Sequence, residues 1–177
     1  MMQELTSFGQ LSISLPFLLS ASENIWRFLG EMGDVMCLGM AAVGSAIGIG
    51  LAGQAAVGAW AREARAGQPM RFTYIILLGM PMSQTLYALI VMNQMRAVFT
   101  NTELAINEAG MLFGIGIATG LGEMLSAWMQ GLIGAAGIRA LSDSEGKGLA
   151  FIIIAMGVIE TVGIFTMVFM LGMIPTA

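Results

Sequence analysis

The sequence predicts an all-α membrane protein with four transmembrane helices, arranged as two tandem, repeated helical hairpins. Hydrophobic residues make up 57% of the 177 residues and charged residues only 10%, whereas a soluble domain carries roughly 25% charged residues. Runs of about 20 predominantly apolar residues cross a bilayer as helices. Four such runs occur, at about 33–61, 70–97, 107–138 and 148–174.

The two halves of the chain are related by a shift of 76 residues that needs no gap. This shift places Gln54 on Gln130 and Gln84 on Glu160. Other matched positions are Gly44 with Gly120, Gly58 with Gly134, Ala59 with Ala135, Met80 with Met156 and Thr85 with Thr161. A repeat of this length indicates the duplication of one helical hairpin.

The repeat divides the chain into a first hairpin at 31–100 and a second at 101–177, preceded by residues 1–30. The segment LSISLPFLL in this N-terminal part is apolar but short, and Arg27 is the first basic residue. A signal peptide has a basic start and a small-residue cleavage site. We therefore expect residues 1–30 to form a retained N-terminal arm or an interfacial helix.

The first helix of each hairpin is rich in small residues, in GSAIGIGLAG at 44–53 and GIGIATGLG at 114–122. Small residues allow helix backbones to approach closely in lipid. The second helices are bulkier, so each hairpin is wedge-shaped, and wedges placed side by side close into an oligomeric ring. Packing alone leaves a compact four-helix bundle equally open.

Composition excludes several classes of function. The chain has no His, which excludes a His-ligated metal site and a Ser-His hydrolase triad. The lone Cys37 excludes an intrachain disulfide. Seven scattered basic residues give no nucleic-acid footprint. Five of them lie within 61–71 and 138–147, which predicts cytoplasmic hairpin loops, with the termini and the central linker outside.

One carboxylate stands out, because Glu160 lies near the middle of the apolar run Leu149–Ile174. A charge at such a depth costs from about 2.5 kcal/mol upward, so this carboxylate is either paired for structural reasons or retained for what it binds. The strongly polar residues of the spans are Gln54, Ser83, Gln84, Glu123, Gln130 and Glu160, accompanied by Thr85, Tyr87 and Thr161. Amide and hydroxyl oxygens are neutral ligands for a hard cation, and one carboxylate supplies the charge.

Pro81 and Glu123 are two further residues that bear on a possible ion-binding site. Pro81 removes a backbone hydrogen bond and kinks its helix, which frees the carbonyl of Leu77, and the polar residues Ser83 and Gln84 follow closely after the kink. Glu123 lies seven positions before Gln130, about 10 Å along the same helix face. By composition it equals Glu160 as a candidate. We expect it to line the inner surface of a ring, with a second position on the ion pathway as the alternative.

Three motifs on these helices resemble one family. MPMSQTLY at 80–87, WMQGLIGAAG at 128–137 and VIETVGI at 158–164 are similar to the membrane-ring proteolipid, the c or K subunit, of V-type rotary ATPases. The likeness is greatest to the bacterial sodium-translocating type and covers roughly residues 33–174.

The resemblance implies a single Na⁺ carried on Glu160. It implies as further ligands the side chains of Gln130, Gln84 and Ser83, the last in place of a threonine, and the backbone carbonyl of Met80. It also implies that Tyr87 hydrogen-bonds the carboxylate, and Pro81, Thr85 and Thr161 adjoin the implied ligands.

The resemblance further implies a non-catalytic subunit of a homo-oligomeric rotor ring in a bacterial plasma membrane. A stator subunit with two ion half-channels and an arginine would exchange the ion, and central-stalk subunits would bind the cytoplasmic loops. Ion flow would drive ATP synthesis, or ATP hydrolysis would pump ions, and no organic cofactor is implied. Because Gln84 replaces one of two carboxylates, each unit carries one ion, which favours pumping.

Other functions remain open from sequence. A rotor protein could carry H⁺ on the same Glu160, although Gln130, Gln84 and Ser83 would then be superfluous as ligands. A small secondary transporter could also combine repeats with a midplane ion site. Its repeats are often inverted, whereas two-helix repeats must be parallel. A structural membrane scaffold would leave the buried carboxylate unexplained.

Overall fold

The computed structural model describes residues 15–176, and it confirms an almost entirely helical chain. Residues 1–14, which belong to the predicted N-terminal arm, and residue 177 lie outside the described residues. The elements are α1 (Leu15–Arg65), α2 (Tyr74–Gly79), a 3₁₀ turn (Met80–Met82), α3 (Ser83–Val98), α4 (Thr102–Asn107), α5 (Ala109–Asp143) and α6 (Leu149–Met173). Within the described part, four helical spans are long and apolar enough to cross a membrane, namely Leu19–Arg65, Tyr74–Val98, Ala109–Asp143 and Leu149–Met173.

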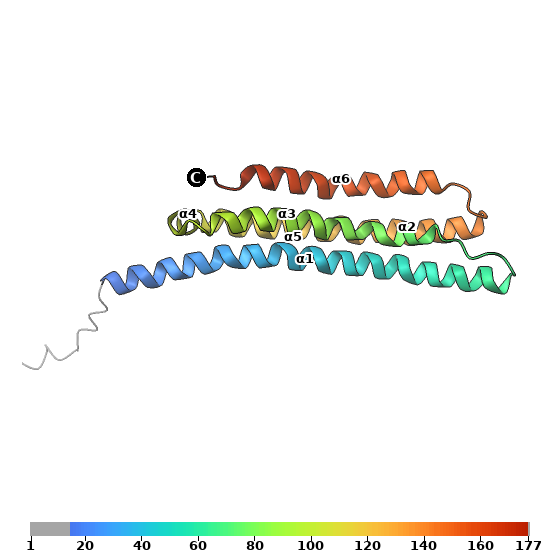
Figure 1. The fold of residues 1–177 in the computed structure, drawn as a ribbon, viewed down its shortest axis with the longest axis horizontal. Coiled ribbons are helices and arrows are strands. Elements are labelled where there is room, and N and C mark those ends of the chain that lie inside the picture. The colour runs from blue at the N-terminus through green and yellow to red at the C-terminus, as the bar shows by residue number, and fades with distance from the viewer. Residues whose placement is uncertain (1–14, 177) are drawn as a thin grey trace, which may run out of the picture.

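The two hairpins run parallel to each other. Figure 1 shows the loop between α1 and α2 and the loop between α5 and α6 at one end of the molecule. The short helix α4, which links the hairpins, and the end of α6 lie at the opposite end (Figure 1). This arrangement is the one expected for tandem repeats of two helices each.

Helix α1 begins well before the predicted start of the first hairpin. It is 51 residues long, or about 75 Å at 1.5 Å per residue, and it runs through residue 31 without interruption. Residues 15–30 contain one glycine, Gly30, near the end of that stretch, and α1 contains no proline after Pro16, so nothing in this stretch breaks the helix. Because the hydrocarbon core is about 30 Å thick, a large part of α1 extends beyond it.

The helices rich in small residues, α1 and α5, pack directly against each other. A Cβ added to Gly116 would lie 2.0 Å from the carbonyl oxygen of Gly33, and one added to Gly131 would lie 2.2 Å from the Cα of Gly48. Glycine at these crossings therefore lets two backbones touch, as the sequence predicts. The bulkier α6 lies on the far side of α5 from α1, and α3 overlaps α5 in this view (Figure 1).

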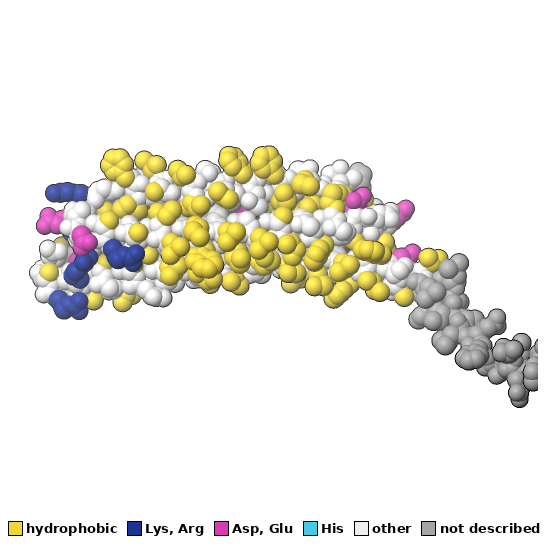
Figure 2. Space-filling model, turned by 180° about the vertical axis from the view of Figure 1, so that it is seen from behind, with side chains coloured by type: hydrophobic (Ala, Val, Ile, Leu, Met, Phe, Trp, Pro, Cys, Tyr) yellow, Lys and Arg dark blue, Asp and Glu magenta, His cyan; other side chains and the backbone are white. Residues whose placement is uncertain are grey.

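Much of the surface between the two ends is apolar. On the face shown in Figure 2, hydrophobic side chains cover the length of the bundle, and basic side chains gather at the end that carries the hairpin loops. Helix α6 contributes large exposed side chains, among them Phe151, Ile154, Val158, Phe165 and Phe169. Such a surface is suited to contact with lipid or with other apolar protein surfaces.

Pro81 changes the local helix geometry as predicted. The α-helix ends at Gly79, and residues Met80–Met82 form a 3₁₀ turn with Pro81 buried inside it. The backbone N–H of Ser83 bonds to the carbonyl of Met80, three residues back rather than four. The tighter turn sets the direction in which α3 starts, and α3 begins with two polar residues, Ser83 and Gln84.

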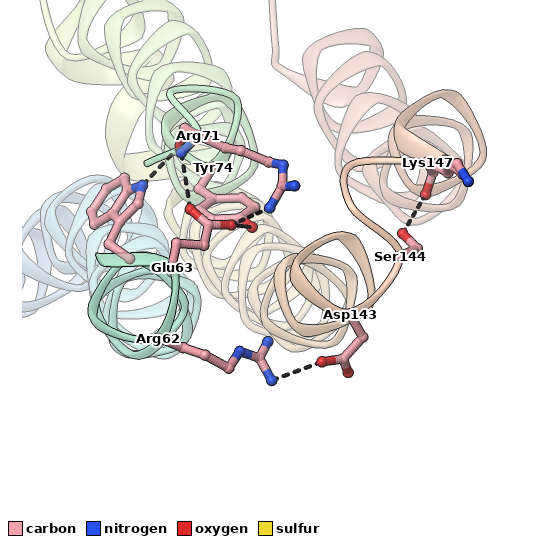
Figure 3. A network of polar contacts seen from close by, with 8 residues as sticks. Arg62, Glu63, Arg71, Tyr74, Asp143, Ser144 and Lys147 are labelled. Carbon is pink, nitrogen blue, oxygen red and sulfur yellow. Dashed lines mark hydrogen bonds and ion pairs between the residues drawn. The ribbon is translucent and has the colours of Figure 1, made fainter. Parts of the chain in front are cut away.

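The first hairpin loop is fixed by a buried carboxylate. Glu63 is 1% exposed and accepts hydrogen bonds from the backbone N–H of Arg71 at 3.0 Å, from the Arg71 guanidinium and from the hydroxyl of Tyr74 at 2.5 Å (Figure 3). The indole N–H of Trp60 donates to the carbonyl of Arg71 at 2.8 Å. These bonds hold the end of α1 against the start of α2.

We expect Glu63→Ala to lower the free energy of unfolding by about 3 kcal/mol, because it leaves buried donors without an acceptor. The control is Arg62→Ala, which breaks an ion pair with Asp143 of 2.7 Å whose side chains are 50% and 67% exposed. An exposed pair contributes about 1 kcal/mol or less. Chemical unfolding of the detergent-solubilised protein compares the two, and equal losses would contradict the structural importance of the buried network.

Candidate cation-binding site

The carboxylate of Glu160 receives three hydrogen bonds from two other helices. The hydroxyls of Ser83 and Tyr87 donate to Oε1 at 2.7 and 2.9 Å, and Nε2 of Gln130 donates to Oε2 at 3.4 Å. Ser83 and Tyr87 are four residues apart on α3, which places them on one face, and Gln130 belongs to α5. The site therefore forms where α3, α5 and α6 meet.

A chain of buried amides continues from the carboxylate into the bundle. Gln84 and Gln130 are both 0% exposed. Nε2 of Gln84 donates to Oε1 of Gln130 at 3.2 Å, and Nε2 of Gln130 also donates to the carbonyl of Met156 at 3.2 Å. Because buried polar groups without partners are costly, this network fixes both glutamines beside Glu160.

Three oxygen atoms surround the hydroxyl of Ser83, which has only one hydrogen to donate. Its Oγ lies 2.9 Å from the carbonyl oxygen of Met80, 3.2 Å from Oε1 of Gln84 and 2.7 Å from Oε1 of Glu160. A hydroxyl has one hydrogen to donate, so at most one of these three oxygens receives it. Lone pairs that converge in this way suit a cation, whose charge attracts all of them at once.

The groups around Glu160 carry oxygen atoms of several kinds. Glu160, Gln84, Ser83 and the carbonyl of Met80 each bring an oxygen atom to this place, whereas Gln130 turns its Nε2 toward Glu160. Hard cations prefer oxygen ligands. Among residues 15–176, no group of three or more His, Cys, Asp or Glu side chains could hold a metal ion. Glu160 is the one carboxyl group among these described residues.

Comparison with known proteins adds to this geometry. A family model described as the C subunit of ATP synthase matches residues 32–95 and 113–173, one segment in each hairpin. The chain belongs to the ATP synthase C-subunit family. The resemblance to c and K proteolipids is thereby confirmed, and two matches in one chain agree with the predicted duplication.

A curated relative of this C-subunit family member is the A-type ATP synthase subunit K of Methanocaldococcus jannaschii. The two are 32% identical over 127 residues, which cover 70% of this chain and 53% of the relative. The chain thus spans about half the length of that relative.

In this C-subunit family member, the residues predicted to bind an ion lie together. They are Glu160, Gln130, Gln84, Ser83 and the carbonyl of Met80, with Tyr87 on the carboxylate and Pro81 in the preceding turn.

Three other polar residues lie apart from the site. Thr85 donates to Ser45 on α1 at 2.8 Å, and Thr161 is exposed and donates to the carbonyl of Val158 in its own helix at 2.7 Å. Gln54 is exposed on α1.

Glu123 lies inside the bundle instead of on the predicted inner surface of a ring. It is 0% exposed, and neither carboxyl oxygen has a hydrogen-bond partner among the described residues. A Cβ added to Gly163 on α6 would be 2.6 Å from Oε2 of Glu123. Gly163 therefore makes room for this carboxyl between α5 and α6.

Sequence reasoning missed Ser126. Its Oγ donates to the carbonyl of Ile159 at 3.0 Å and accepts from Nε2 of Gln84 at 3.3 Å. The spacing gave a signal, because Ser126 lies three residues after Glu123 and four before Gln130, on the same helix face. Ser126 holds Gln84 and the α6 backbone together one residue before Glu160.

Proposed function

We propose that this protein is a rotor-ring subunit that carries Na⁺ across the membrane on Glu160, in a V-type rotary ATPase that couples ion flow to ATP hydrolysis or synthesis. The observation that supports this most directly is the convergence of Ser83, Gln84 and the Met80 carbonyl beside the carboxylate. A carrier of H⁺ needs the carboxyl but none of these additional oxygens. Membership of the ATP synthase C-subunit family supports the rotor, and the three site motifs support the bacterial Na⁺ type.

The hydrogen bonds around Glu160 indicate how the site would exchange its cargo. Ser83, Tyr87 and Gln130 donate hydrogen bonds to the carboxylate. When Na⁺ binds, its positive charge would stabilise the carboxylate in place of some of these hydrogen bonds. A half-turn of the Gln130 amide would present oxygen in place of nitrogen. It would give up the bonds with Gln84 and with the Met156 carbonyl, and Gln84 would then donate to Ser126 alone. Ser83 could donate elsewhere. The ion and the carboxylate together are neutral, which lowers the cost of passing lipid.

The position of Glu160 suits exchange with a neighbouring protein. Its side chain is partly exposed, whereas Gln84 and Gln130 are fully buried behind it. A stationary subunit with two half-channels could reach the carboxylate from the side of α6, and a fixed cationic side chain there would displace Na⁺. In a ring of identical copies, α1 and α5 would face inward, because the narrow helices take the inner radius.

The orientation follows from the charges at the two ends. Arg62, Arg65, Arg71, Arg139 and Lys147 lie at the end with the hairpin loops. Because basic loops remain on the cytoplasmic side, the hairpin loops would face the cytoplasm of a bacterial cell and meet the central stalk there. The linker between the hairpins would face outward.

The test is carbodiimide labelling of the purified membrane-embedded protein across pH, with modified residues mapped by mass spectrometry. Carbodiimides modify protonated carboxyls in apolar surroundings. We expect Glu160 to be labelled without Na⁺, and Na⁺ to suppress this labelling at fixed pH while K⁺ at equal ionic strength does not. Labelling of Glu160 that Na⁺ leaves unchanged would identify a proton rotor. Labelling confined to Glu123 would overturn the assignment of the site.

A further inference from the structure

Glu123 on α5 is a buried carboxyl that the cation site at Glu160 does not use. Its side chain is 0% exposed, and neither carboxyl oxygen has a hydrogen-bond partner among the described residues. The ion pairs formed within residues 15–176 do not include it. A buried carboxylate without a charge partner is strongly unfavourable. The position of Glu123 is therefore stable only if its negative charge is neutralised.

The hydroxyl groups beside Glu123 on its own helix are bound to carbonyl groups. Thr119 lies four residues before Glu123 and Ser126 three residues after it, on the same face of α5. The hydroxyl of Thr119 donates to the carbonyl of Ile115 at 2.8 Å. That of Ser126 donates to the carbonyl of Ile159 at 3.0 Å. Because a hydroxyl has one hydrogen to donate, neither group can also stabilise a negative charge on Glu123.

The other helices bring no free positive charge to this carboxyl. Their titratable side chains, counted between residues 35 and 61 of α1 and over all of α3 and α6, are Cys37, Tyr87, Arg96 and Glu160. Arg96 is the single cation in this set, and it pairs with Asp34 at 3.0 Å. The hydroxyl of Tyr87 donates to Glu160 at 2.9 Å. Cys37 donates to the carbonyl of Ala88 at 3.4 Å. These surroundings favour a neutral Glu123.

Gly163 on α6 makes the room that Glu123 occupies, close to the other carboxyl. A Cβ at Gly163 would lie 2.6 Å from Oε2 of Glu123 and 3.3 Å from Oγ of Ser126. Gly163 follows Glu160 by three residues, about one turn along the same helix face. Two carboxylates held near each other repel when both are charged. A charged Glu160 therefore also favours the neutral form of Glu123.

We propose that Glu123 binds a proton and retains it while Glu160 exchanges its ion. A proton needs no ligand besides the carboxyl group itself. A metal cation such as Na⁺ needs several oxygen ligands, which converge around Glu160 and not around Glu123. The chain thus has two carboxyls in the core of the bundle but exchanges a cation on only one of them. The proposal does not depend on whether Glu160 carries Na⁺ or H⁺.

The test is infrared difference spectroscopy of the purified, detergent-solubilised protein, which detects the C=O stretch of a protonated carboxyl. The wild type, Glu123→Gln and Glu160→Gln are compared at neutral and mildly alkaline pH, in Na⁺ or in K⁺. We expect a carboxyl band that is lost in Glu123→Gln, remains in Glu160→Gln and has equal amplitude in both salts. After transfer to D₂O this band should shift more slowly than the band of Glu160, which is partly exposed.

The outcomes separate the retained proton from the ion site. Identical spectra of the wild type and Glu123→Gln would show an ionised Glu123 and overturn the proposal. A Glu123 band that Na⁺ removes at constant pH, or that exchanges with D₂O as fast as the Glu160 band, would overturn it too. The Glu160 band is an independent readout, because its insensitivity to Na⁺ would contradict only the proposed ion specificity.

Thermal unfolding midpoints of the variants are compared first. If Glu123→Gln is misfolded, Glu123→Met replaces it as the spectral blank, because methionine is neutral and fills irregular space in a core. The band assigned to Glu123 must be missing from this variant as well, and its persistence would assign the proton to another carboxyl and overturn the proposal.

Discussion

Glu160→Gln is expected to abolish Na⁺ binding while the helices remain folded. The substitution keeps the shape and an oxygen that can accept from Ser83 and Tyr87, but it removes the only negative charge among the converging groups. Two opposite unit charges 4 Å apart interact by about 4 kcal/mol at an effective dielectric constant of 20, so we expect affinity to fall about a thousandfold. Binding of ²²Na⁺ to the purified protein measures this directly, and Na⁺ transport by the reconstituted assembly should be lost with it.

The matched control is Glu123→Gln, which makes the same chemical change seven residues before Gln130 on α5. Neither oxygen of Glu123 bonds to a described residue, so we expect ²²Na⁺ affinity to stay within about threefold of wild type. Normal binding by the Glu160 variant would refute the site. Loss of binding in the Glu123 variant, with Glu160→Gln unaffected, would show that the two carboxyls have been assigned in the wrong order.

Gly116→Ala is expected to destabilise the bundle strongly, although it adds only one methyl group. The added Cβ would lie 2.0 Å from the carbonyl oxygen of Gly33 and 2.7 Å from its Cα. Both are backbone atoms, so no side chain can rotate away and α1 must separate from α5. Overpacking typically costs 1–3 kcal/mol, and we expect a loss of about 3 kcal/mol in the free energy of unfolding.

Gly114→Ala is the control on the same helix, two residues away. Its Cβ would meet nothing within 4 Å, and replacing glycine by alanine within a helix usually stabilises by about 0.5–1 kcal/mol. Chemical unfolding of the two variants in detergent should therefore give changes of opposite sign. Similar behaviour of both variants would mean that the α1–α5 contact does not govern stability.

The sequence by itself determined the number of spans, the duplication and the central acid. These features depend only on the order of residues along the chain. The length of an apolar run indicates a span, and a fixed shift of 76 residues relates Gln84 to Glu160. A carboxylate within hydrocarbon is costly, which makes both Glu123 and Glu160 candidates, and the repeat that relates Glu160 to Gln84 favours Glu160. The extent of α1 was underestimated, because the apolar run that marks a span need not end where the helix ends.

Only the tertiary structure decided which polar side chains meet. Thr85 and Thr161 are repeat-related and adjoin Gln84 and Glu160 in sequence, yet one bonds to Ser45 on α1 and the other to its own helix. Ser126 passed unnoticed but joins Gln84 to the backbone of α6. Glu123 was expected on a surface and is buried against Gly163. The physical reason is that helical periodicity fixes which residues share a face, whereas the rotation and partner of each helix depend on backbone contacts such as Gly33 with Gly116.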